Sequence, residues 1–396
     1  MKTRNRKIED LYLMLRNLIF GGLRYFTKTY SKGDLLDIDI KNILVIRLDR
    51  IGDMVMTTPI FRALKEKWPD VQITVLTNPV SKKVVINNPF IDCILVYDKE
   101  NKNKSLCRRL FFFKDVRERG FDLVVDPYLD YEMNTAIITR FVGSRYRLGF
   151  EFAGRGIFYN IRYHSNIFPV SADKKHMIDH YLDLVTCLGI ETKKRQPEVF
   201  LSSEEREKAS MLLEKDGVNP DNRIVGIHPG GNYESQRWPI ERFAAISDYL
   251  IASYGMKVIL FGGRDERHLI SEFRDHAVKT PIVLDKLNLR EFMSVLSNCS
   301  LFLCNNSGPL HIATALNIPT VSTMGPTVPF HWWPCGKNHT VLRKDLDCSP
   351  CKKGICETHE CMKLITTNDF LTAVETQLRR LNISHPDKDS AIYVKR

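Results

Sequence analysis

Short runs of apolar residues alternate along this chain with longer segments whose apolar positions recur every three or four residues. The first run, at 43–47, leads into a loop that contains glycine, and 54–67 then carries a helical pattern. Further runs that predict strands occur at 71–76, 93–96 and 121–126, with helical patterns between them. Buried strands that alternate with helices are typical of a parallel, doubly wound α/β sheet.

A second series of the same kind follows residues 196–222, a stretch rich in Glu, Lys and Ser that we interpret as a linker with one exposed helix. Its predicted strands are 224–228, 258–261, 282–284, 301–304 and 320–322. Its predicted helices are 240–253, 266–276, 289–297, 308–315 and 368–381. Two such series predict two Rossmann-like domains that face a central cleft, with ligands at the carboxyl ends of the strands.

The chain therefore divides into four predicted parts. Residues 41–200 form one Rossmann-like domain and 220–366 a second, between an N-terminal extension at 1–40 and a C-terminal helix and tail at 367–396. A length of 396 residues is long for one domain, and 43% hydrophobic residues is a globular value.

The extension at 1–40 has apolar residues at helical spacing between many Arg and Lys side chains. Such a basic amphipathic helix can lie in a membrane interface, or it can pack on the body of the protein. The net charge of +11 favours phosphate-rich ligands, anionic lipid head groups or nucleic acid, but the sequence contains no recognised nucleic-acid module. With no signal peptide and no apolar run of ~18 residues, we expect a cytoplasmic protein.

Three loops that follow predicted strands carry candidate chemistry. In the first, Gly52 and Asp53 precede a helix, so the carboxylate is either a helix N-cap or a catalytic base, and the glycine allows a ligand close to the backbone. In the second, Gly230, Gly231 and Asn232 expose backbone N–H groups suited to phosphate.

Two further features, a cation and the start of a helix, are candidates for binding an anion. Arg237, shortly after the second loop, can neutralise a diphosphate. The third loop runs through Asn306 and Ser307 into a helix that begins near Gly308, whose unpaired N–H groups and dipole make an anion site. An ordinary capped helix would explain Ser307, but not the matching glycine loop in the same domain.

Taken in this order, the segments 47–59, 228–239 and 305–316 resemble glycosyltransferase family nine, the ADP-heptose:lipopolysaccharide heptosyltransferases. The similarity covers roughly residues 42–380 and includes 324–327. It implies a GT-B fold and inverting, metal-independent transfer of a sugar, expected to be heptose, from a nucleotide-diphosphate donor. It also implies a lipid-linked glycan acceptor at the cytoplasmic face of the inner membrane, which suits the basic extension as a peripheral membrane contact.

The resemblance assigns roles to individual residues. Asp53 matches the catalytic Asp of the family, and His176 matches a His on the acceptor side, although a surface helix residue is an equal alternative. The donor-binding positions are matched by residues of the third loop and of the segment after the next strand: Ser307, Gly308, His311, Gly325 and Thr327.

Two positions depart from the family pattern. Asn306 stands where an acidic residue commonly contacts donor hydroxyls, and Gln236 stands where Lys is common. These departures bear on the sugar more than on transfer itself. The alternatives are a transferase for a different nucleotide sugar, a nucleotide-sugar epimerase on the same fold, and a non-catalytic sugar-nucleotide-binding scaffold.

A cluster of four cysteines, Cys348, Cys351, Cys356 and Cys361, has the spacing C-x2-C-x4-C-x4-C. Four thiolates in a short segment suit a structural Zn or Fe–S site, a disulfide-prone loop or reduced thiols, and no cofactor is expected for catalysis. The other six cysteines lie among apolar neighbours and are expected to be buried: Cys93, Cys107, Cys187, Cys299, Cys304 and Cys335.

Overall fold

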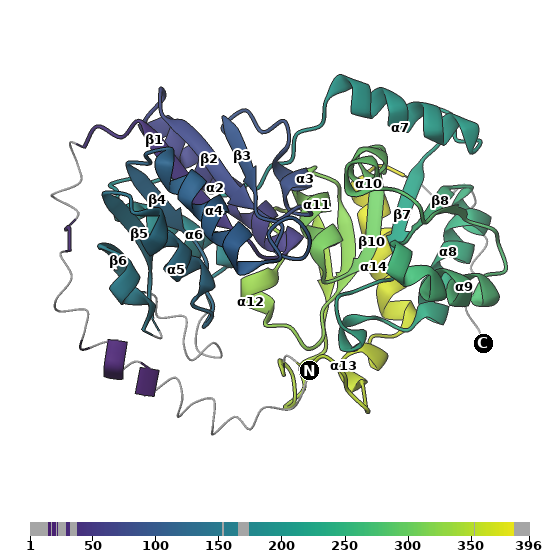
Figure 1. Ribbon diagram of the computed structural model, residues 1–396. Coiled ribbons are helices and arrows are strands. Elements are labelled where there is room, and N and C mark those ends of the chain that lie inside the picture. The colour runs from purple at the N-terminus through teal and green to yellow at the C-terminus, as the bar shows by residue number, and fades with distance from the viewer. Residues whose placement is uncertain are drawn as a thin grey trace. The chain divides into compact units, whose positions relative to one another are not determined.

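The computed structural model describes residues 15–16, 18–20, 22, 29–31, 38–152, 154–164, 174–351 and 353–383. The chain splits into two compact units, Met1–Arg195 and Gln196–Arg396. Each unit is built on one six-stranded parallel sheet with helices packed against it (Figure 1). The predicted fold class, two doubly wound α/β units, is therefore confirmed.

The sheet of the first unit has the strand order β3-β2-β1-β4-β5-β6, and every neighbouring pair is parallel. The strands are β1 (Asn42–Arg47), β2 (Gln72–Thr77), β3 (Cys93–Val96), β4 (Leu123–Asp126), β5 (Tyr146–Glu151) and β6 (Ile161–His164). The chain order reverses between β1 and β4, which is where doubly wound sheets bind their ligands.

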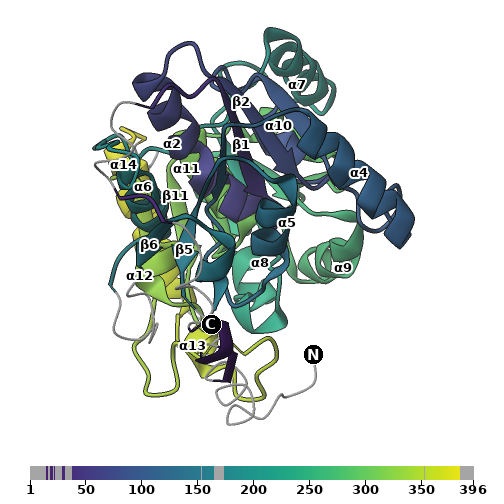
Figure 2. The ribbon, with the colours of Figure 1, turned by 60° about the vertical axis from the view of Figure 1, so that its left-hand side comes forward.

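Helices of the first unit cover this sheet, with α4 along its outside (Figure 2). They are α2 (Ile51–Lys67), α3 (Lys82–Val85), α4 (Leu106–Glu118), α5 (Asn134–Val142), α6 (Met177–Thr186) and the 3-10 turn η3 (Arg155–Phe158). A core of Leu, Ile, Val and Phe side chains from β1, β4, α4 and α5 holds the layers together.

Helix α2 contains a proline, and a neighbouring side chain makes the hydrogen bond that the proline cannot make. Pro59 has no N–H to donate to the carbonyl of Val55. The Thr58 hydroxyl donates to that carbonyl instead, at 2.7 Å. Most of α2 is buried, so the start of this helix, where the candidate base lies, is held in a fixed position.

The second unit repeats the topology, with the strand order β12-β11-β10-β7-β8-β9 and parallel neighbours throughout. Its strands are β7 (Ile224–His228), β8 (Lys257–Phe261), β9 (Ile282–Leu284), β10 (Leu301–Asn305), β11 (Thr320–Thr323) and β12 (His339–Leu342). Here the order reverses between β7 and β10.

Helices also surround the second sheet. They are α7 (Ser203–Lys215), α8 (Ile240–Tyr254), α9 (Arg267–His276), α10 (Leu289–Leu296), α11 (Gly308–Ala315), α12 (Pro329–Trp332), α13 (Glu360–Lys363), α14 (Thr367–Arg380), and the turns η4 (Glu234–Gln236) and η5 (Arg264–Glu266). Helix α14 packs into the same core as β7, β8 and α8, with Phe370 stacked on Trp238 at 4.5 Å between ring centroids. The C-terminal helix is thus part of this unit's core.

Most of the predicted amphipathic helix at 1–40 lies outside the described residues. Of the residues described there, 15–16, 18–20 and 22 are helical. Leu15, Leu18 and Ile19 are exposed, whereas Arg16 is buried. Among the described helices, none is long and apolar enough to cross a membrane.

Candidate functional site

A buried arginine at the end of β1 organises the reversal point of the first sheet. The Arg47 guanidinium donates to the Pro127 carbonyl at 2.7 Å and to the Tyr181 hydroxyl at 2.6 Å. It also forms ion pairs, with Nη2 3.2 Å from Asp53 Oδ1 and Nε 2.9 Å from Asp49 Oδ1. One positive charge therefore joins β1, the loop after β4, and α6 to two carboxylates.

The candidate base Asp53 lies in the first turn of α2, three residues after the N-cap Arg50. Asp53 is therefore not the N-cap of this helix. Its side chain is 14% exposed, whereas that of Arg47 is 1% exposed, so the carboxylate is partly accessible to solvent. Burial raises the pKa of Asp53, and the charges of Arg47 and Arg50 and a 3.4 Å hydrogen bond from Tyr181 oppose that rise.

The second carboxylate, Asp49, shares the same guanidinium. Burial raises its pKa to about 8, with Asp53 adding to the rise and Arg47 opposing it. Pairing with both carboxylates and with Tyr181 outweighs burial for Arg47, so the pKa of the guanidinium is raised and it stays charged. Two carboxylates beside one cation leave an excess negative charge, which makes the uptake of a proton by this group favourable.

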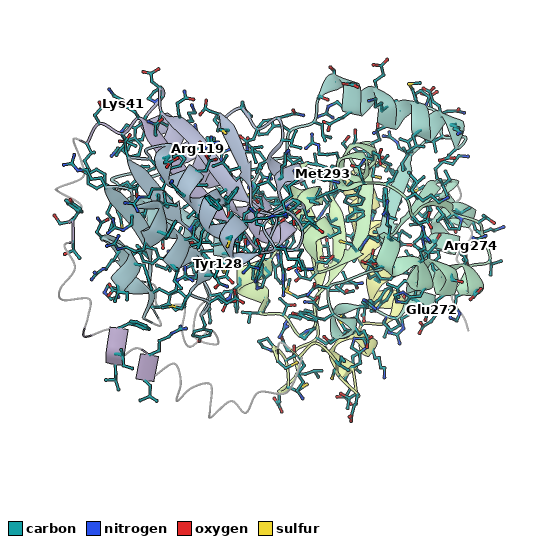
Figure 3. The ribbon with its side chains drawn as sticks, viewed as in Figure 1. Lys41, Arg119, Tyr128, Glu272, Arg274 and Met293 are labelled. Carbon is teal, nitrogen blue, oxygen red and sulfur yellow. The ribbon has the colours of Figure 1, made fainter. Side chains whose placement is uncertain are left out.

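A second buried arginine fixes the loop after β4, on the other side of the reversal point. Arg155 pairs with Asp126 at 2.9 Å and also donates to the backbone carbonyls of Asp130 and Glu132. The loop carries Tyr128, which is labelled in Figure 3, and Asp130, whose charge adds to the raised pKa of Asp53. Polar side chains of this loop thus lie near the candidate base.

His176 and Gly52, the predicted acceptor-side residues, lie at the starts of helices α6 and α2, whose side chains Tyr181 and Asp53 form the contacts described above. His176 is the N-cap of α6, and its Nδ1 accepts a hydrogen bond from the Ile178 N–H at 3.1 Å. Helix α6 carries Tyr181, so His176 helps to fix the helix whose tyrosine touches Arg47 and Asp53. Gly52 is buried in the first turn of α2, directly before Asp53.

In the second unit, one buried amide ties together the loops after three strands. Asn305 Nδ2 donates to the carbonyls of Pro229 at 2.7 Å and Gly230 at 3.0 Å. Asn305 Oδ1 accepts from the Trp238 N–H at 2.9 Å and the Thr323 hydroxyl at 2.8 Å. This side chain therefore fixes the spacing between the predicted phosphate loop, the start of α8 and the end of β11.

The first of the two loop glycines packs against a carboxylate that the sequence analysis did not select. Glu266 Oε2 lies 3.1 Å from His228 Nε2 and accepts from the Gly263 N–H at 2.8 Å. A Cβ atom on Gly230 would lie 1.8 Å from Glu266 Oε1, so the glycine is needed here. Burial alone would raise the pKa of Glu266, but His228, the Gly263 N–H and Arg237 lower it to about 2, which keeps Glu266 ionised.

Arg237 and Gln236, the candidate cation and the departure beside it, both contact the loops. Arg237 donates from Nε and Nη2 to the Gly231 carbonyl, at 3.3 and 3.2 Å. Gln236 uses both ends of its amide, since it accepts from the Tyr233 N–H and donates to the Thr327 hydroxyl, each at 3.3 Å. A lysine at this position could not accept the Tyr233 bond.

Asn306, the second departure, is also engaged through its amide. It is buried, and its Nδ2 donates to the Trp332 carbonyl at 3.1 Å. Its backbone N–H donates to the Thr323 carbonyl at 3.0 Å. A carboxylate here would face the Trp332 carbonyl without a proton to donate, so the local structure suits Asn.

The start of α11 matches the prediction in position. Ser307 is its N-cap and Gly308 its first residue, but the Ser307 hydroxyl lies 3.4 Å from the Asn305 carbonyl rather than on the first N–H groups of the helix. Ser307 is therefore the N-cap by position, but its side chain makes no capping hydrogen bond to the helix. His311, one turn further, is buried, with its ring 6.2 Å from that of Trp332.

Comparison with known protein families shows which family the chain belongs to. The family model of glycosyltransferase family 9 (heptosyltransferase) matches residues 109–362. The chain belongs to this family. The predicted family is thus confirmed, and the protein is a glycosyltransferase.

Individual relatives agree with this assignment. Lipopolysaccharide heptosyltransferase 3 of Escherichia coli is 26% identical over 295 residues, which are 72% of this chain and 84% of the relative. Lipooligosaccharide heptosyltransferase 2 of Haemophilus influenzae is 27% identical over 318 residues, 76% of this chain and 88% of the relative.

Solved structures share the GT-B fold. A family 9 glycosyl transferase from Veillonella parvula superposes with a TM-score of 0.78 at 24% identity, covering 87% of this chain and 99% of that one. The ADP-heptose lps heptosyltransferase II of E. coli superposes with a TM-score of 0.70 at 22% identity, covering 86% and 99%.

The four clustered cysteines of this glycosyltransferase are free thiols, with Cys348 exposed and Cys361 buried. Burial raises the pKa of Cys361, and the nearby thiols of Cys351, Cys356 and Cys348 raise it further. Within the described residues, no group of three or more His, Cys, Asp or Glu side chains is placed to hold a metal ion. The predicted Zn or Fe–S site thus finds no support in this geometry.

The cysteine segment instead packs against the loop after β11 and against the turn η4. A Cβ atom on Gly325 would lie 2.6 Å from Met362 Sδ and 2.8 Å from Cys361 Sγ. The Cys351 N–H donates to the Pro326 carbonyl at 3.1 Å, and the Ser235 N–H donates to the Gly354 carbonyl at 3.2 Å. Gly325 therefore allows this segment to pack closely against the loop after β11.

The remaining cysteines differ in burial. Cys299 and Cys304 are buried as expected, and burial strongly raises both thiol pKa values. The expectation is wrong for Cys107, which is exposed on α4, and Cys93, Cys187 and Cys335 are only partly buried.

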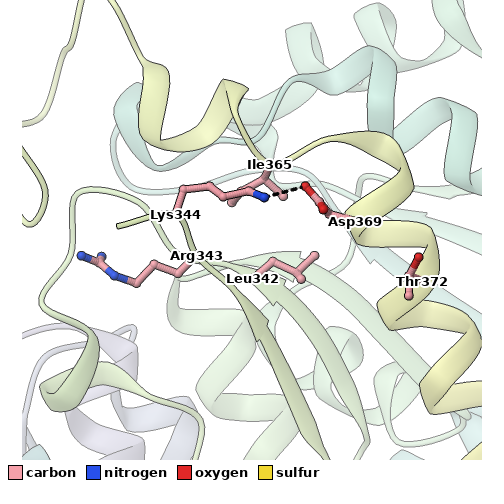
Figure 4. A pocket seen from close by; sticks show the side chains of 6 residues that line it. All are labelled: Leu342, Arg343, Lys344, Ile365, Asp369 and Thr372. Atoms are coloured by element: carbon pink, nitrogen blue, oxygen red, sulfur yellow. Dashed lines mark ion pairs between the residues drawn. The ribbon is translucent and has the colours of Figure 1, made fainter. Parts of the chain in front are cut away.

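A small hollow lies beside β12 and α14 of the second unit (Figure 4). It is lined by Leu342, Arg343, Lys344, Ile365, Asp369 and Thr372. The Lys344–Asp369 ion pair, 3.0 Å long, crosses it. Its volume of about 190 Å³ is below the roughly 300–1,000 Å³ of typical ligand sites, and its lining includes none of the candidate site residues. We do not assign the donor to it.

Proposed function

We propose that this glycosyltransferase transfers heptose from ADP-heptose to a lipid-linked glycan of the lipopolysaccharide core type. The relatives named lipopolysaccharide and lipooligosaccharide heptosyltransferase support this substrate class. The observation that carries the proposal is the carboxylate of Asp53, which is partly exposed and is paired with a buried guanidinium at the reversal point of the sheet.

In the proposed reaction, Asp53 takes the proton of an acceptor hydroxyl as its oxygen attacks the anomeric carbon of the donor. The new carbon–oxygen bond forms while the bond to the diphosphate oxygen breaks, so the configuration inverts and the nucleoside diphosphate leaves. Burial favours this role because it raises the pKa of Asp53, and a stronger base accepts the proton more readily.

Arg47 and Tyr181 are positioning residues in this mechanism. The hydroxyl of Tyr181 receives a hydrogen bond from Arg47 and donates one to Asp53, which fixes the carboxylate and stabilises its ionised form. The fixed loop after β4 brings Tyr128 and Asp130 near the base, where their polar groups are suited to bind acceptor hydroxyls. Gly52 is buried directly before Asp53, so it is not assigned a direct contact with the acceptor.

The donor is assigned to the second unit. Backbone N–H groups of 230–232 and the start of α11 would hold the diphosphate, and Arg237 would move from the Gly231 carbonyl to the leaving group. The ionised Glu266, in the turn η5 that follows β8, is suited to accept hydrogen bonds from ribose hydroxyls. We assign His311 on α11, and Gly325 and Thr327 in the loop after β11, to the same donor site.

A different donor sugar is the second candidate, and the amides of Asn306 and Gln236 favour it. Both side chains are neutral and bonded to neighbouring loops, so the sugar would be contacted by amide groups rather than by a carboxylate and an ammonium. Comparing ADP-heptose with ADP-hexoses as donors separates the two candidates. The donor that the enzyme uses should give the glycosylated acceptor, and the other donors should give none.

For the place of action we propose the cytoplasmic face of the inner membrane, where a lipid-linked acceptor is available. The basic amphipathic pattern of 1–40 supports a peripheral contact, as does the exposure of Leu15, Leu18 and Ile19. Metal-independent transfer is part of the proposal: a chelator such as EDTA should leave the rate unchanged, and loss of activity restored by a divalent cation would contradict it.

The first test is to titrate the purified protein with ADP, UDP and GDP, following the unfolding temperature and then the heat of binding. Selective stabilisation by ADP is the expected result, followed by ADP release from ADP-heptose in the presence of a core acceptor. Preference for UDP or GDP would overturn the heptose assignment. Absence of binding by a folded sample would overturn the donor site.

A further inference from the structure

Helix α4 of the first unit presents large apolar side chains to solvent. Leu106 and Phe111 are each 71% exposed and Leu110 is 50% exposed, all within the first two turns of the helix. Cys107, between them, is exposed as well. Several exposed large apolar residues on one short helix mark an interaction surface more often than isolated ones do.

The neighbouring helix α5 adds to this group. Its Ile137 and Phe141 are exposed, and the Phe141 ring lies 6.3 Å from that of Phe113 on α4, so the two helices are in contact. We refer to the exposed apolar residues of both helices as the α4–α5 surface, which consists of Leu106, Leu110, Phe111, Ile137 and Phe141.

The exposure of these residues follows from how α4 packs. Its inner face is already filled by Phe113 and Val116, which are buried in the core of the unit. Its first turn is fixed by Arg109, which donates to the Asn103 carbonyl at 2.9 Å and to the Lys104 carbonyl at 3.1 Å. Rotating α4 to hide Phe111 would expose Phe113, so the apolar surface is a property of the fold.

Cations flank the α4–α5 surface. Residues 106–119 contain five basic and two acidic residues, and 134–145 contain two basic residues and no acidic one. The exposed basic residues include Arg119, labelled in Figure 3; the full set is Arg108, Lys114, Arg117, Arg119, Arg140 and Arg145. Apolar side chains surrounded by Arg and Lys are the pattern that binds an anionic lipid surface.

The topology gives this surface a functional direction. Helices α4 and α5 follow β3 and β4, so both begin at the carboxyl edge of the first sheet. Asp53 and the loop after β4 lie at the same edge. A bilayer that contacts the first turns of α4 therefore lies on the side of the unit that carries the candidate base.

We propose that the α4–α5 surface docks this unit on an anionic lipid bilayer. The charge complementarity favours an anionic lipid surface, because the exposed basic side chains of this region outnumber the exposed acidic ones by six to two. The consequence for catalysis rests on the proposed function, since docking would bring a membrane-embedded acceptor to Asp53. The docking itself can be measured without any transfer reaction.

The test uses the full chain and vesicles of phosphatidylethanolamine with about one third phosphatidylglycerol, compared with pure phosphatidylcholine, in a sedimentation assay. The Leu110→Ser/Phe111→Ser double variant should bind the anionic vesicles roughly tenfold more weakly than the wild type. Met211→Ser/Val278→Ser is the matched control, because those residues are 63% and 85% exposed in the second unit. The control should bind like the wild type.

Equal binding by the α4 variant and the wild type would overturn the proposal. So would a wild type that ignores vesicles but self-associates through these residues, seen as a monomeric α4 variant beside an oligomeric wild type. Turnover of a soluble acceptor fragment separates the two proposals. The α4 variant should retain it, whereas a protein that binds vesicles without transferring any sugar would refute the proposed function alone.

Discussion

Replacing Tyr181 with Phe removes one hydroxyl that touches both Arg47 and Asp53. The hydroxyl lies 2.6 Å from Arg47 Nη2 and 3.4 Å from Asp53 Oδ1. Hydrogen bonds to charged groups contribute roughly 1.5–3 kcal/mol, and the long bond to Asp53 is assigned about 1 kcal/mol. Because this bond stabilises the ionised carboxylate, its loss should raise the pKa of Asp53 further.

The assay is the pH dependence of kcat/KM at low acceptor concentration, from about pH 5 to 9. A base acts only when ionised, so activity rises with pH through its pKa. A higher pKa moves this acidic limb of the Tyr181→Phe profile to higher pH. At pH values below the pKa of the base, kcat/KM of the variant should therefore be about fivefold lower than that of the wild type. Unfolding in urea should show a loss of roughly 1–3 kcal/mol, since the buried guanidinium loses an acceptor.

The matched control is Tyr163→Phe, which also removes a tyrosine hydroxyl bound to a carboxylate, that of Asp183 at 2.8 Å. This variant should keep the acidic limb of the wild type. If Tyr181→Phe also keeps it, with kcat/KM unchanged, then Asp53 is not the titrating base or Tyr181 does not hold it, and the proposed mechanism is refuted.

Three further outcomes follow from the described contacts. Asp53→Asn should lower kcat by roughly 10²–10⁴ without weakening nucleotide binding, measured by transfer and by calorimetry. Gly230→Ala forces a Cβ atom against Glu266, so it should weaken nucleotide binding and lower the free energy of unfolding by about 1–3 kcal/mol. In the second unit, Arg290 of α10 donates from Nε to Oε1 of Glu205 on α7 at 2.6 Å. Hydrogen bonds from Arg290 foremost lower the pKa of Glu205 to about 2, so Glu205→Gln should destabilise the fold by about 1–2 kcal/mol at neutral pH.

The sign of the Glu205 effect sets its pH dependence. A carboxylate whose pKa is lower in the folded state stabilises the fold above its ordinary pKa of 4.5 and loses this contribution as the pH falls towards 2. The difference between wild type and Glu205→Gln should therefore shrink over that range in denaturant titrations. A difference that stayed constant would assign the effect to packing. For the other two variants, unchanged transfer by Asp53→Asn or unchanged binding by Gly230→Ala would contradict the assigned roles.

Local pattern was enough to find the first carboxylate and the glycine loop. Asp53 and Gly230 each follow a continuous apolar strand, and a strand, loop and helix in succession can be identified within some 20 residues of sequence. Arg47 and Tyr181 were not selected as site residues, because their contact joins residues 134 positions apart. Asn305 likewise shows its role only when the loops after three strands are brought together.

Three strands, β5, β6 and β12, were not predicted from the sequence, for equally physical reasons. Strand β5 contains Arg147 and Gly149, which interrupt its apolar run. The glycine is present because the Tyr159 ring fills the space where a Cβ atom would lie, 2.3 Å from the nearest ring atom. Strands β6 and β12 have only four residues each and lie at the sheet edges, where one side needs no apolar cover.

The chain boundary between Arg195 and Gln196 also separates the two sets of contacts. Arg47, Asp53 and Tyr181 all precede it, while the network around Asn305 and Glu266 lies wholly after it. Recombination between related genes at this boundary would exchange one complete network for another without leaving either half-assembled. If the proposed donor and acceptor assignments hold, preference for each substrate can diversify as a separate inherited module.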